Sequence, residues 1–286
     1  MIWVNWQTSL FALAGLGMAV TYTMFQPDLP AQVLMLAPLV AVLGLPHGAL
    51  DLPIAEALWP LTGWRRKLLF IALYLGLAGS VILIWLLLPG AALAVFLAYS
   101  ALHFSGDWTL ASPSLRWSGG AATIGAPALL HHGEVEAIFA VLAAQEAAAI
   151  IADAAALVGA LALAGFVLSG LLSRQAREAA ALEQAILWIT AAGLPPLMYF
   201  VVYFCALHSV RHFMATMRVN PDVRRAMAVA VMLSATVTLA ACMVLLYVSV
   251  AHVVNLHDQI IRIVFIGLGA LTVPHMTLVD RFHRMV

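Results

Sequence analysis

The sequence predicts an all-α fold: a polytopic transmembrane helix bundle that forms a single domain over residues 1–286 and encloses a buried metal site. The chain is 64% hydrophobic and 9% charged, with a mean hydropathy of +1.03, whereas soluble domains carry roughly a quarter charged residues. A hydrocarbon core about 30 Å thick needs about 20 apolar residues per helix, so this length allows about eight to ten spans. Three short polar motifs inside the apolar runs predict the metal site.

Apolar runs separated by turn residues define the spans of the first half. Pro46 lies inside the second run, so we expect that helix to kink just before His47. Residues 134–147, after the fifth run, are amphipathic, which is typical of a helix at the membrane interface. No basic residue precedes the first run, which favours a retained membrane helix over a cleaved signal peptide. The predicted spans are 5–25, 31–58, 67–88, 91–110 and 118–131.

In the second half, residues 178–217 fit either one long broken helix or two spans that meet at Pro195 and Pro196. Basic loop residues favour the cytoplasmic side of a membrane. If the N-terminus is cytoplasmic and residues 178–217 form two spans, the basic loop residues fall on the cytoplasmic side. Only Arg262 then lies on the other side of the membrane. We therefore expect about ten spans in the inner (plasma) membrane. The remaining spans are 148–172, 178–194, 195–217, 223–250 and 257–280.

The charged residues exclude two classes of function. The 13 basic and 13 acidic residues balance, and no dense basic patch indicates a nucleic-acid partner. The one lysine, Lys67, lies at a loop edge. A rhodopsin needs a buried lysine for its retinal Schiff base, so this chain is not one. Nothing in the sequence defines an oligomeric state.

Three apolar runs carry a polar pair that begins with histidine: HGALD (47–51), HFSGD (103–107) and HSVRH (208–212). In a helix this spacing places both side chains on one face, about 6 Å apart at Cβ. Ionisable groups inside spans are costly and indicate function. Interhelical hydrogen bonding is the alternative, but it does not require imidazole at the first position of all three motifs. We therefore expect the three helices to meet around one buried metal.

The identity of the metal stays open at this point, because several neutral imidazoles without a thiolate suit iron, copper, zinc or nickel. Asp51 and Asp107 either ligate the metal or accept the Nδ1–H of a ligand ring, and we favour the second role. The segment HSVRH lacks the glutamate of the HExxH zinc-protease motif.

The other histidines are weaker candidates. His275 follows Pro274 in the last span, and we expect it to face the same cavity as a neighbour of the ligands rather than as a ligand. Four of them, His131, His132, His252 and His257, fall near the non-cytoplasmic ends of the spans, and His283 lies in a basic tail. We expect none of these five to ligate the metal.

Aromatic residues flank the second and third motifs. Ordinary packing and interfacial belts are one explanation. The other is a flat, apolar tunnel beside the metal, which suits a long polyene better than a polar substrate. The candidate tunnel residues are Tyr99, Phe104, Trp108, Tyr203 and Phe204.

Four segments resemble the Brp/Blh family of bacterial and archaeal membrane β-carotene 15,15′-dioxygenases: GLPHGALD (44–51), SALHFSGDW (100–108), ALHSVRHF (206–213) and VPHM (273–276). They occur in the family order and cover nearly the whole chain. The resemblance implies a non-haem Fe(II) site, with O2 and β-carotene as substrates and two molecules of all-trans-retinal as products. It carries the iron ligands onto His47, His103, His208 and His212, with Asp51 and Asp107 as neighbouring polar residues.

Two other functions remain as alternatives. A diiron membrane desaturase or hydroxylase also uses histidine pairs on helices, but normally needs about eight histidines in clusters. A non-enzymatic haem carrier or metal permease would need only two or more buried imidazoles. Metal counting and a haem absorption band distinguish these alternatives from the iron oxygenase.

Overall fold

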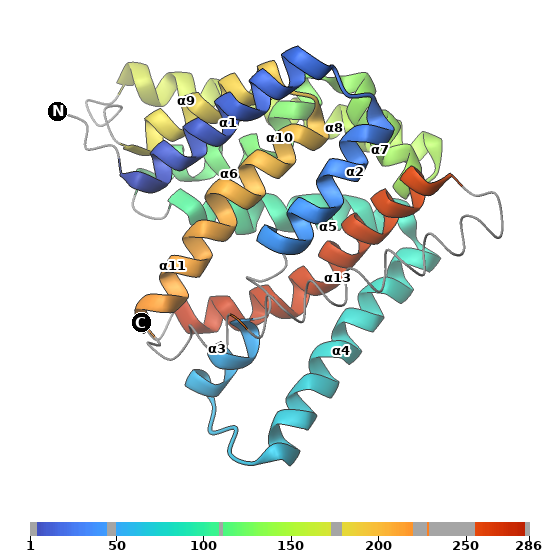
Figure 1. Cartoon of the computed structure of the whole chain (residues 1–286), viewed down its shortest axis with the longest axis vertical. Helices are drawn as coiled ribbons and strands as arrows, with labels where there is room; N and C mark the ends of the chain where they lie inside the picture. Colours follow the sequence, from blue (N-terminus) through green and yellow to red (C-terminus); the bar gives the residue numbers. More distant parts are fainter. Residues whose placement is uncertain are drawn as a thin grey trace.

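The computed structural model describes residues 5–44, 50–108, 111–172, 179–219, 228 and 255–283, and the regular elements in these ranges are all helical (Figure 1). The all-α prediction is therefore confirmed. The α-helices are α1 (Trp6–Phe25), α2 (Leu29–Leu39), α3 (Asp51–Leu58), α4 (Trp64–Leu87), α5 (Pro89–Phe104), α6 (Pro113–Leu130), α7 (His132–Leu142), α8 (Gln145–Leu172), α9 (Ala179–Gly193), α10 (Pro196–Tyr203), α11 (Ser209–Val219) and α13 (Leu256–His283). Two π-helices, η1 (Val40–Gly44) and η5 (Phe204–His208), and the 3-10 helix η3 (Ser105–Trp108) complete the described elements.

Six helical segments in the described ranges are long and apolar enough to cross a membrane. They coincide with the predicted spans at 5–25, 67–88, 91–110, 148–172, 195–217 and 257–280. The helices at 118–131 and 178–194 also form, as α6 and α9. The predicted span at 223–250 lies outside the described residues, apart from residue 228. The protein is thus a helical membrane protein, although the described residues contain fewer full spans than we predicted.

Two predicted boundaries can be compared with the helices. The break at Pro195 and Pro196 is confirmed, because α9 ends at Gly193 and α10 begins at Pro196. Within the predicted kinked span at 31–58, α2 ends at Leu39 and passes into the π-helix η1, and α3 begins at Asp51. Residues 45–49, which include Pro46 and His47, lie outside the described residues.

The predicted interfacial segment 134–147 also differs from the structure. It covers α7 and the first turn of α8 rather than one continuous helix. The apolar face of α7, with Val135, Ile138 and Phe139, is buried against α8 and α13. The amphipathic pattern therefore reflects packing within the bundle.

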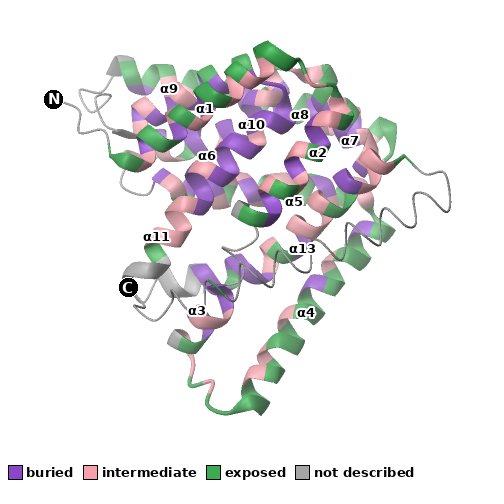
Figure 2. Ribbon diagram, in the orientation of Figure 1, coloured by how far each residue is buried: buried purple, intermediate pink, exposed green. Residues whose placement is uncertain are grey.

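Burial separates a central helical segment from a peripheral one (Figure 2). In the most apolar window of Pro196–Ala215, which spans α10, η5 and α11, 67% of the residues are buried, compared with 11% for α4. Large apolar side chains such as Leu73, Leu83 and Leu86 project outward from α4. Lipid can solvate such a surface, whereas water cannot. This segment carries the HSVRH motif, in which His208 and Ser209 are buried and the following three residues are half-buried.

Close contacts between helix backbones fix the position of α6. A Cβ atom on Gly125 would overlap the backbone of Gly159 in α8, and one on Gly159 would overlap the backbone of Gly125. A Cβ atom on Gly120 would overlap Ala101 and Ser105 at the end of α5. Small residues permit this approach of membrane helices. As a result α6 supports the 3-10 turn η3, on which Asp107 lies.

Candidate active site

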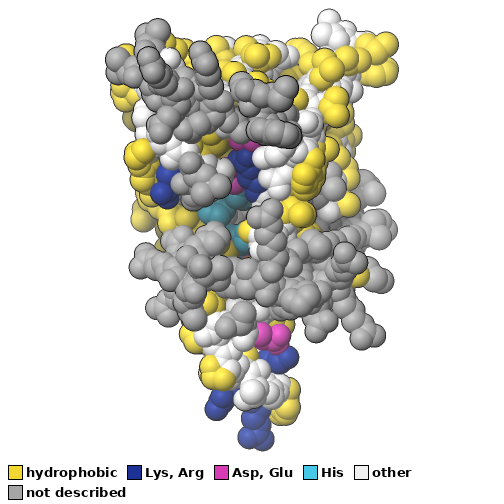
Figure 3. Space-filling view, turned by 90° about the vertical axis from the view of Figure 1, so that its left-hand side faces the viewer, with side chains coloured by type: hydrophobic (Ala, Val, Ile, Leu, Met, Phe, Trp, Pro, Cys, Tyr) yellow, Lys and Arg dark blue, Asp and Glu magenta, His cyan; other side chains and the backbone are white. Residues whose placement is uncertain are grey.

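Four histidines from three regions of the chain come together in the structure: His103 at the end of α5, His208 at the end of η5, His212 in α11 and His275 in α13. The Nε2 atoms of His103 and His208 are 3.2 Å apart. The ring centroids of His212 and His275 are 4.9 Å apart. Histidine side chains are visible in a recess of the face in Figure 3, close to Lys or Arg side chains. The predicted ligands of two motifs therefore meet, and His275 joins them, while His47 lies outside the described residues.

The local helix geometry presents His208 to this cluster. His208 is the last residue of the π-helix η5, and the regular helix α11 starts at the next residue. A π-bulge inserts an extra residue into a helical turn and is frequent at functional sites. His208 is 4% exposed, so its imidazole is desolvated.

Each motif aspartate contacts a histidine on a distant helix. Asp107 Oδ2 is 3.2 Å from Nδ1 of His208, and Asp51 Oδ1 is 2.7 Å from Nδ1 of His275. A carboxylate accepts the Nδ1–H, which leaves Nε2 as the nitrogen with the lone pair. Both pairs are buried. Each aspartate is thus placed to fix the tautomer of a histidine. That histidine is not the one in its own HxxxD motif, so the motif spacing alone does not identify it.

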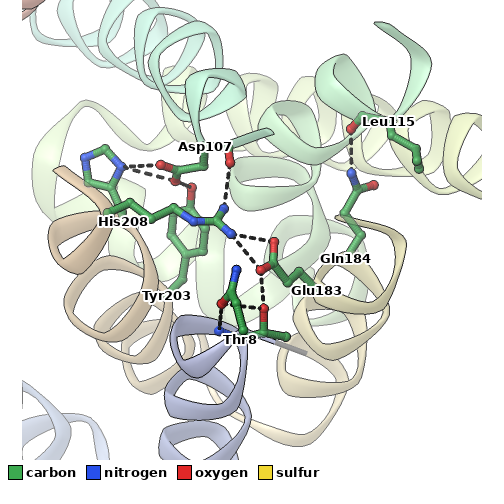
Figure 4. A network of polar contacts seen from close by, with 9 residues as sticks. Thr8, Asp107, Leu115, Glu183, Gln184, Tyr203 and His208 are labelled. Atoms are coloured by element: carbon green, nitrogen blue, oxygen red, sulfur yellow. Dashed lines mark hydrogen bonds and ion pairs between the residues drawn. The ribbon is translucent and has the colours of Figure 1, made fainter. Parts of the chain in front are cut away.

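Asp107 belongs to a buried polar network that joins six elements, η3, α10, η5, α11, α9 and α1 (Figure 4). The hydroxyl of Tyr203 donates to Asp107 Oδ2 at 2.5 Å, and Arg211 Nη1 donates to the backbone carbonyl of Asp107 at 2.6 Å. Arg211 Nη2 then contacts both oxygens of Glu183 at 2.6 Å, and Thr8 donates to Glu183 Oε1 at 2.5 Å. This network connects the His208 ring to α9 and α1.

Asp51 has a simpler environment. Tyr74 of α4 donates its hydroxyl to Asp51 Oδ2 at 2.7 Å, while Asp51 Oδ1 contacts His275. Next to Asp51, a small apolar cluster joins α3 to the end of α13 and includes Leu50, Ile54 and Leu278.

An apolar cleft adjoins the histidines. Its polar lining consists of Tyr74, Ser100, His103, His208, Thr272 and His275, and its aromatic lining consists of Phe96, Phe104, Phe200, Phe204 and Phe265. The rings of Phe200 and Phe204 stack with centroids 5.1 Å apart. The cleft therefore presents flat hydrophobic walls that end on imidazole.

The predicted tunnel residues divide between two positions. Phe104 and Phe204 line the cleft. Trp108 and Tyr203 stack on each other with centroids 6.2 Å apart, on the side of Asp107, and do not belong to the described lining. Tyr99 is half-buried on α5 and is also outside that lining.

The histidines that we did not expect to ligate have contacts of their own. His131 contacts the carbonyl of Ala191 at 2.8 Å, and His132 contacts Asp153 at 2.9 Å on the exposed surface. His257 lies 3.1 Å from Asp258. His252 lies outside the described residues, and so does the side chain of His283.

Sequence reasoning missed Arg211, Glu183 and Tyr74. A signal for the first two was present, because an arginine and a glutamate inside apolar helices are rare and usually paired. Arg211 even lies within HSVRH. Tyr74 lies in an ordinary apolar helix, and no pattern in the sequence distinguishes it.

The clustered histidines offer nitrogen donors of the kind that bind a metal. In the described part of the chain, no group of three or more His, Cys, Asp or Glu side chains forms a complete metal site. The 3.2 Å separation of the two Nε2 atoms nevertheless suits two ligands of one ion. With metal–nitrogen bonds of about 2.1 Å, such atoms lie about 3.0 Å apart at 90° and about 3.4 Å apart at a tetrahedral angle. The His103–His208 pair therefore fits two imidazole ligands of one metal ion.

The fold and the site define an integral-membrane helical protein with an apolar, aromatic cleft that ends on buried histidines. A model of the family described as beta-carotene 15,15'-dioxygenase matches residues 38–283. The beta-carotene 15,15'-dioxygenase of uncultured marine bacterium 66A03 is 33% identical over 257 residues, which cover 86% of this chain and 92% of that protein. No solved structure matches the chain. The chain belongs to the beta-carotene 15,15'-dioxygenase family, a family of carotenoid-cleaving enzymes, so the resemblance drawn from its four motifs is confirmed.

Proposed function

We propose that this protein uses O2 and a non-haem Fe(II) ion to cleave β-carotene at its central 15,15′ double bond, which yields two molecules of all-trans-retinal. The observation that carries the proposal is the apolar cleft that has His103 and His208 in its wall. A polyene offers no hydrogen-bonding group, so a site for it needs hydrophobic contact along most of its length. Family membership supports the same substrate.

His47, His103, His208 and His212 would hold the iron through neutral imidazole nitrogens. When bound, Fe(II) would supply the one-electron chemistry that lets O2 react with a carbon–carbon double bond. Asp107 would keep the proton of His208 on Nδ1, so that Nε2 is the donor atom. In the overall reaction the C15=C15′ bond breaks, and each of its carbons gains one oxygen atom as an aldehyde.

The aromatic walls would hold the polyene and exclude water. Phe200 lies 5.4 Å from Phe265 and 5.1 Å from Phe204 between ring centroids, so three rings from two helical segments form one continuous surface. Shape along this surface, rather than hydrogen bonding, would select the central double bond. We place the enzyme in the plasma membrane, where the bilayer dissolves the carotenoid and lets it enter from the side.

The test is expression in β-carotene-producing bacteria, followed by chromatography of the extracted pigments. We expect aerobic cells to lose β-carotene and accumulate retinal, and anaerobic cells to keep their colour. His208→Ala should abolish retinal formation, while His132→Ala, which alters an exposed histidine, should not. Persistent colour without retinal in aerobic cells that contain the folded protein would refute the proposal.

Two alternatives make different predictions for the purified protein. A diiron desaturase or hydroxylase would contain two irons for each chain, whereas we expect one. A haem carrier would show a Soret band, which we expect to be absent. Four histidines meet in the described residues. This number favours a site for one iron, since diiron sites of this class need about twice as many histidine ligands.

A further inference from the structure

The sequence predicts that His275 faces the same cavity as the motif histidines, as a neighbour of the ligands. In the structure its ring lies within the histidine cluster. The ring centroid of His275 is 4.9 Å from that of His212 and 5.7 Å from that of His103. His275 also lines the cleft together with His103 and His208. Helix α13 thus contributes an imidazole to the same wall as the two motif helices.

These distances can be compared with those expected for ligands of one ion. A metal–nitrogen bond of about 2.1 Å places an imidazole centroid about 3.2 Å from the metal, so two ligand rings lie about 4.5 Å apart at 90° and about 6.4 Å apart at 180°. The His103–His208 pair, with centroids 4.8 Å apart, falls within this range. Both distances from His275 fall within it as well. The ring of His275 therefore lies at separations from His103 and His212 that two ligands of one ion can have.

The hydrogen bonds of His275 prepare the ring for ligation. Asp51 lies 2.7 Å from Nδ1, so the carboxylate accepts the Nδ1–H and leaves a lone pair on Nε2. Tyr74 donates to the other oxygen of Asp51 and holds the carboxylate in place. His208 has the same arrangement, in which Asp107 contacts Nδ1 and the hydroxyl of Tyr203 donates to Asp107. Carboxylate–histidine pairs of this kind are the usual support of metal-bound imidazoles.

We propose that His275 is a further ligand of the iron, delivered by α13 and oriented by Asp51 and Tyr74. This inference rests on the proposed function, since it adds a donor to the same iron site. It predicts that the metal couples α13 to the α5 and α11 side of the bundle.

The experiment measures metal binding directly, with Co(II) as a spectroscopic probe of the full-length protein in detergent. After chelation and reloading, we expect wild-type protein to bind one equivalent. His275→Ala should weaken Co(II) binding by about 100-fold or more and change the ligand-field absorption. Asp51→Asn should weaken binding by about 10- to 100-fold with a similar spectrum, because the ligand remains but its support is lost. Added imidazole should restore the wild-type spectrum to His275→Ala.

His132→Ala is the matched control, because it removes a histidine that also contacts a carboxylate, at 2.9 Å, but on the exposed surface. It should bind Co(II) as the wild type does. If His275→Ala does not fold, His275→Asn keeps a side-chain N–H that can donate to Asp51, and the same measurements apply to it.

The outcomes separate this inference from the proposed function. An affinity within threefold of wild type and an unchanged Co(II) spectrum in the His275 variant would overturn the inference while leaving the function intact. Wild-type protein that binds one metal but forms no retinal would refute the function, and the ligand assignment would still be decided by the spectra. Loss of affinity, an altered spectrum and recovery with imidazole would support His275 as a ligand, since a purely structural residue would not give that recovery.

Discussion

In both buried imidazole–carboxylate pairs an aspartate contacts Nδ1 of a histidine, but different residues hold the two aspartates in place. Asp107 and His208 belong to a charged network in which Arg211 contacts the backbone of Asp107 and the carboxylate of Glu183. In the described part of the chain, Asp51 of the second pair accepts a hydrogen bond from a neutral hydroxyl, that of Tyr74. The first pair is thereby joined to α1 and α9, whereas the second depends on α4 and on apolar packing between α3 and α13.

This difference separates two ways of fixing a catalytic histidine. A buried network that includes an ion pair is sensitive to the loss of any single charge, because the remaining charge is then uncompensated. A single hydroxyl contributes less, and its removal leaves a smaller defect. Changes on the Asp107 side should therefore affect folding and activity together, and changes on the Asp51 side should affect mainly the metal.

Arg211→Met should have the largest effect on stability. It leaves Glu183, whose side chain is 2% exposed, without its cationic partner, and breaking a buried pair in this way costs about 3–5 kcal/mol. Unfolding in mixed micelles, followed by circular dichroism, measures the loss. The double variant Arg211→Met/Glu183→Gln should recover part of it, because no unpaired charge remains. Equal stability of the single and double variants would contradict the interpretation of the network.

Gly120→Ala should come next, with a cost of about 1–3 kcal/mol. The added methyl group would overlap Ala101 and Ser105, so it would displace the turn that carries Asp107. The matched control is Gly76→Ala in α4, where a Cβ atom meets nothing within 4 Å. That variant should be neutral or slightly more stable, and it should keep its iron. Iron loss in both variants would show that the effect is not specific to η3.

Tyr203→Phe and Tyr74→Phe compare the two pairs directly, because each variant removes one hydroxyl that donates to an aspartate. We expect Tyr203→Phe to cost about 1.5–3 kcal/mol, since the Tyr203 side chain is fully buried. Tyr74→Phe should cost about 0.5–1.5 kcal/mol, since Tyr74 is only half-buried. The same unfolding assay ranks the two variants, and the reverse order would contradict the difference in support.

Asp153→Asn should have the smallest effect. Its contact with His132 has the same chemistry as the two buried pairs, but the carboxylate side chain is 76% exposed. Exposed pairs of this kind contribute about 0–1 kcal/mol. Stability and iron content should therefore match those of the wild type, and a clear loss of iron would indicate that the surface pair has a role in the site.

The sequence predicted much of the fold because apolar runs and prolines act locally. The break before Pro196 and the span at 257–280 are examples. The convergence of His103, His208 and His212 was also predictable, because a bilayer excludes isolated ionisable groups. The partners of the aspartates were not, since Asp51 contacts a residue 224 positions away. Such pairings depend on helix rotation and tertiary packing, which the HxxxD spacing does not contain. The cleft residue Phe265 was missed for the same reason.

The π-helix η5 determines how the end of the central segment faces the rest of the protein. Because α11 continues directly from it, His208, Arg211 and His212 form one block whose internal spacing is set by the following helix. Deleting one residue from 204–207 would rotate this block by about 100° relative to α10, since each residue of a regular helix turns by that angle. Both imidazoles and the guanidinium would then leave their partners at the same time. Loss of one residue from the apolar segment 204–207, which holds no candidate ligand, would thus disable the enzyme as completely as loss of a ligand.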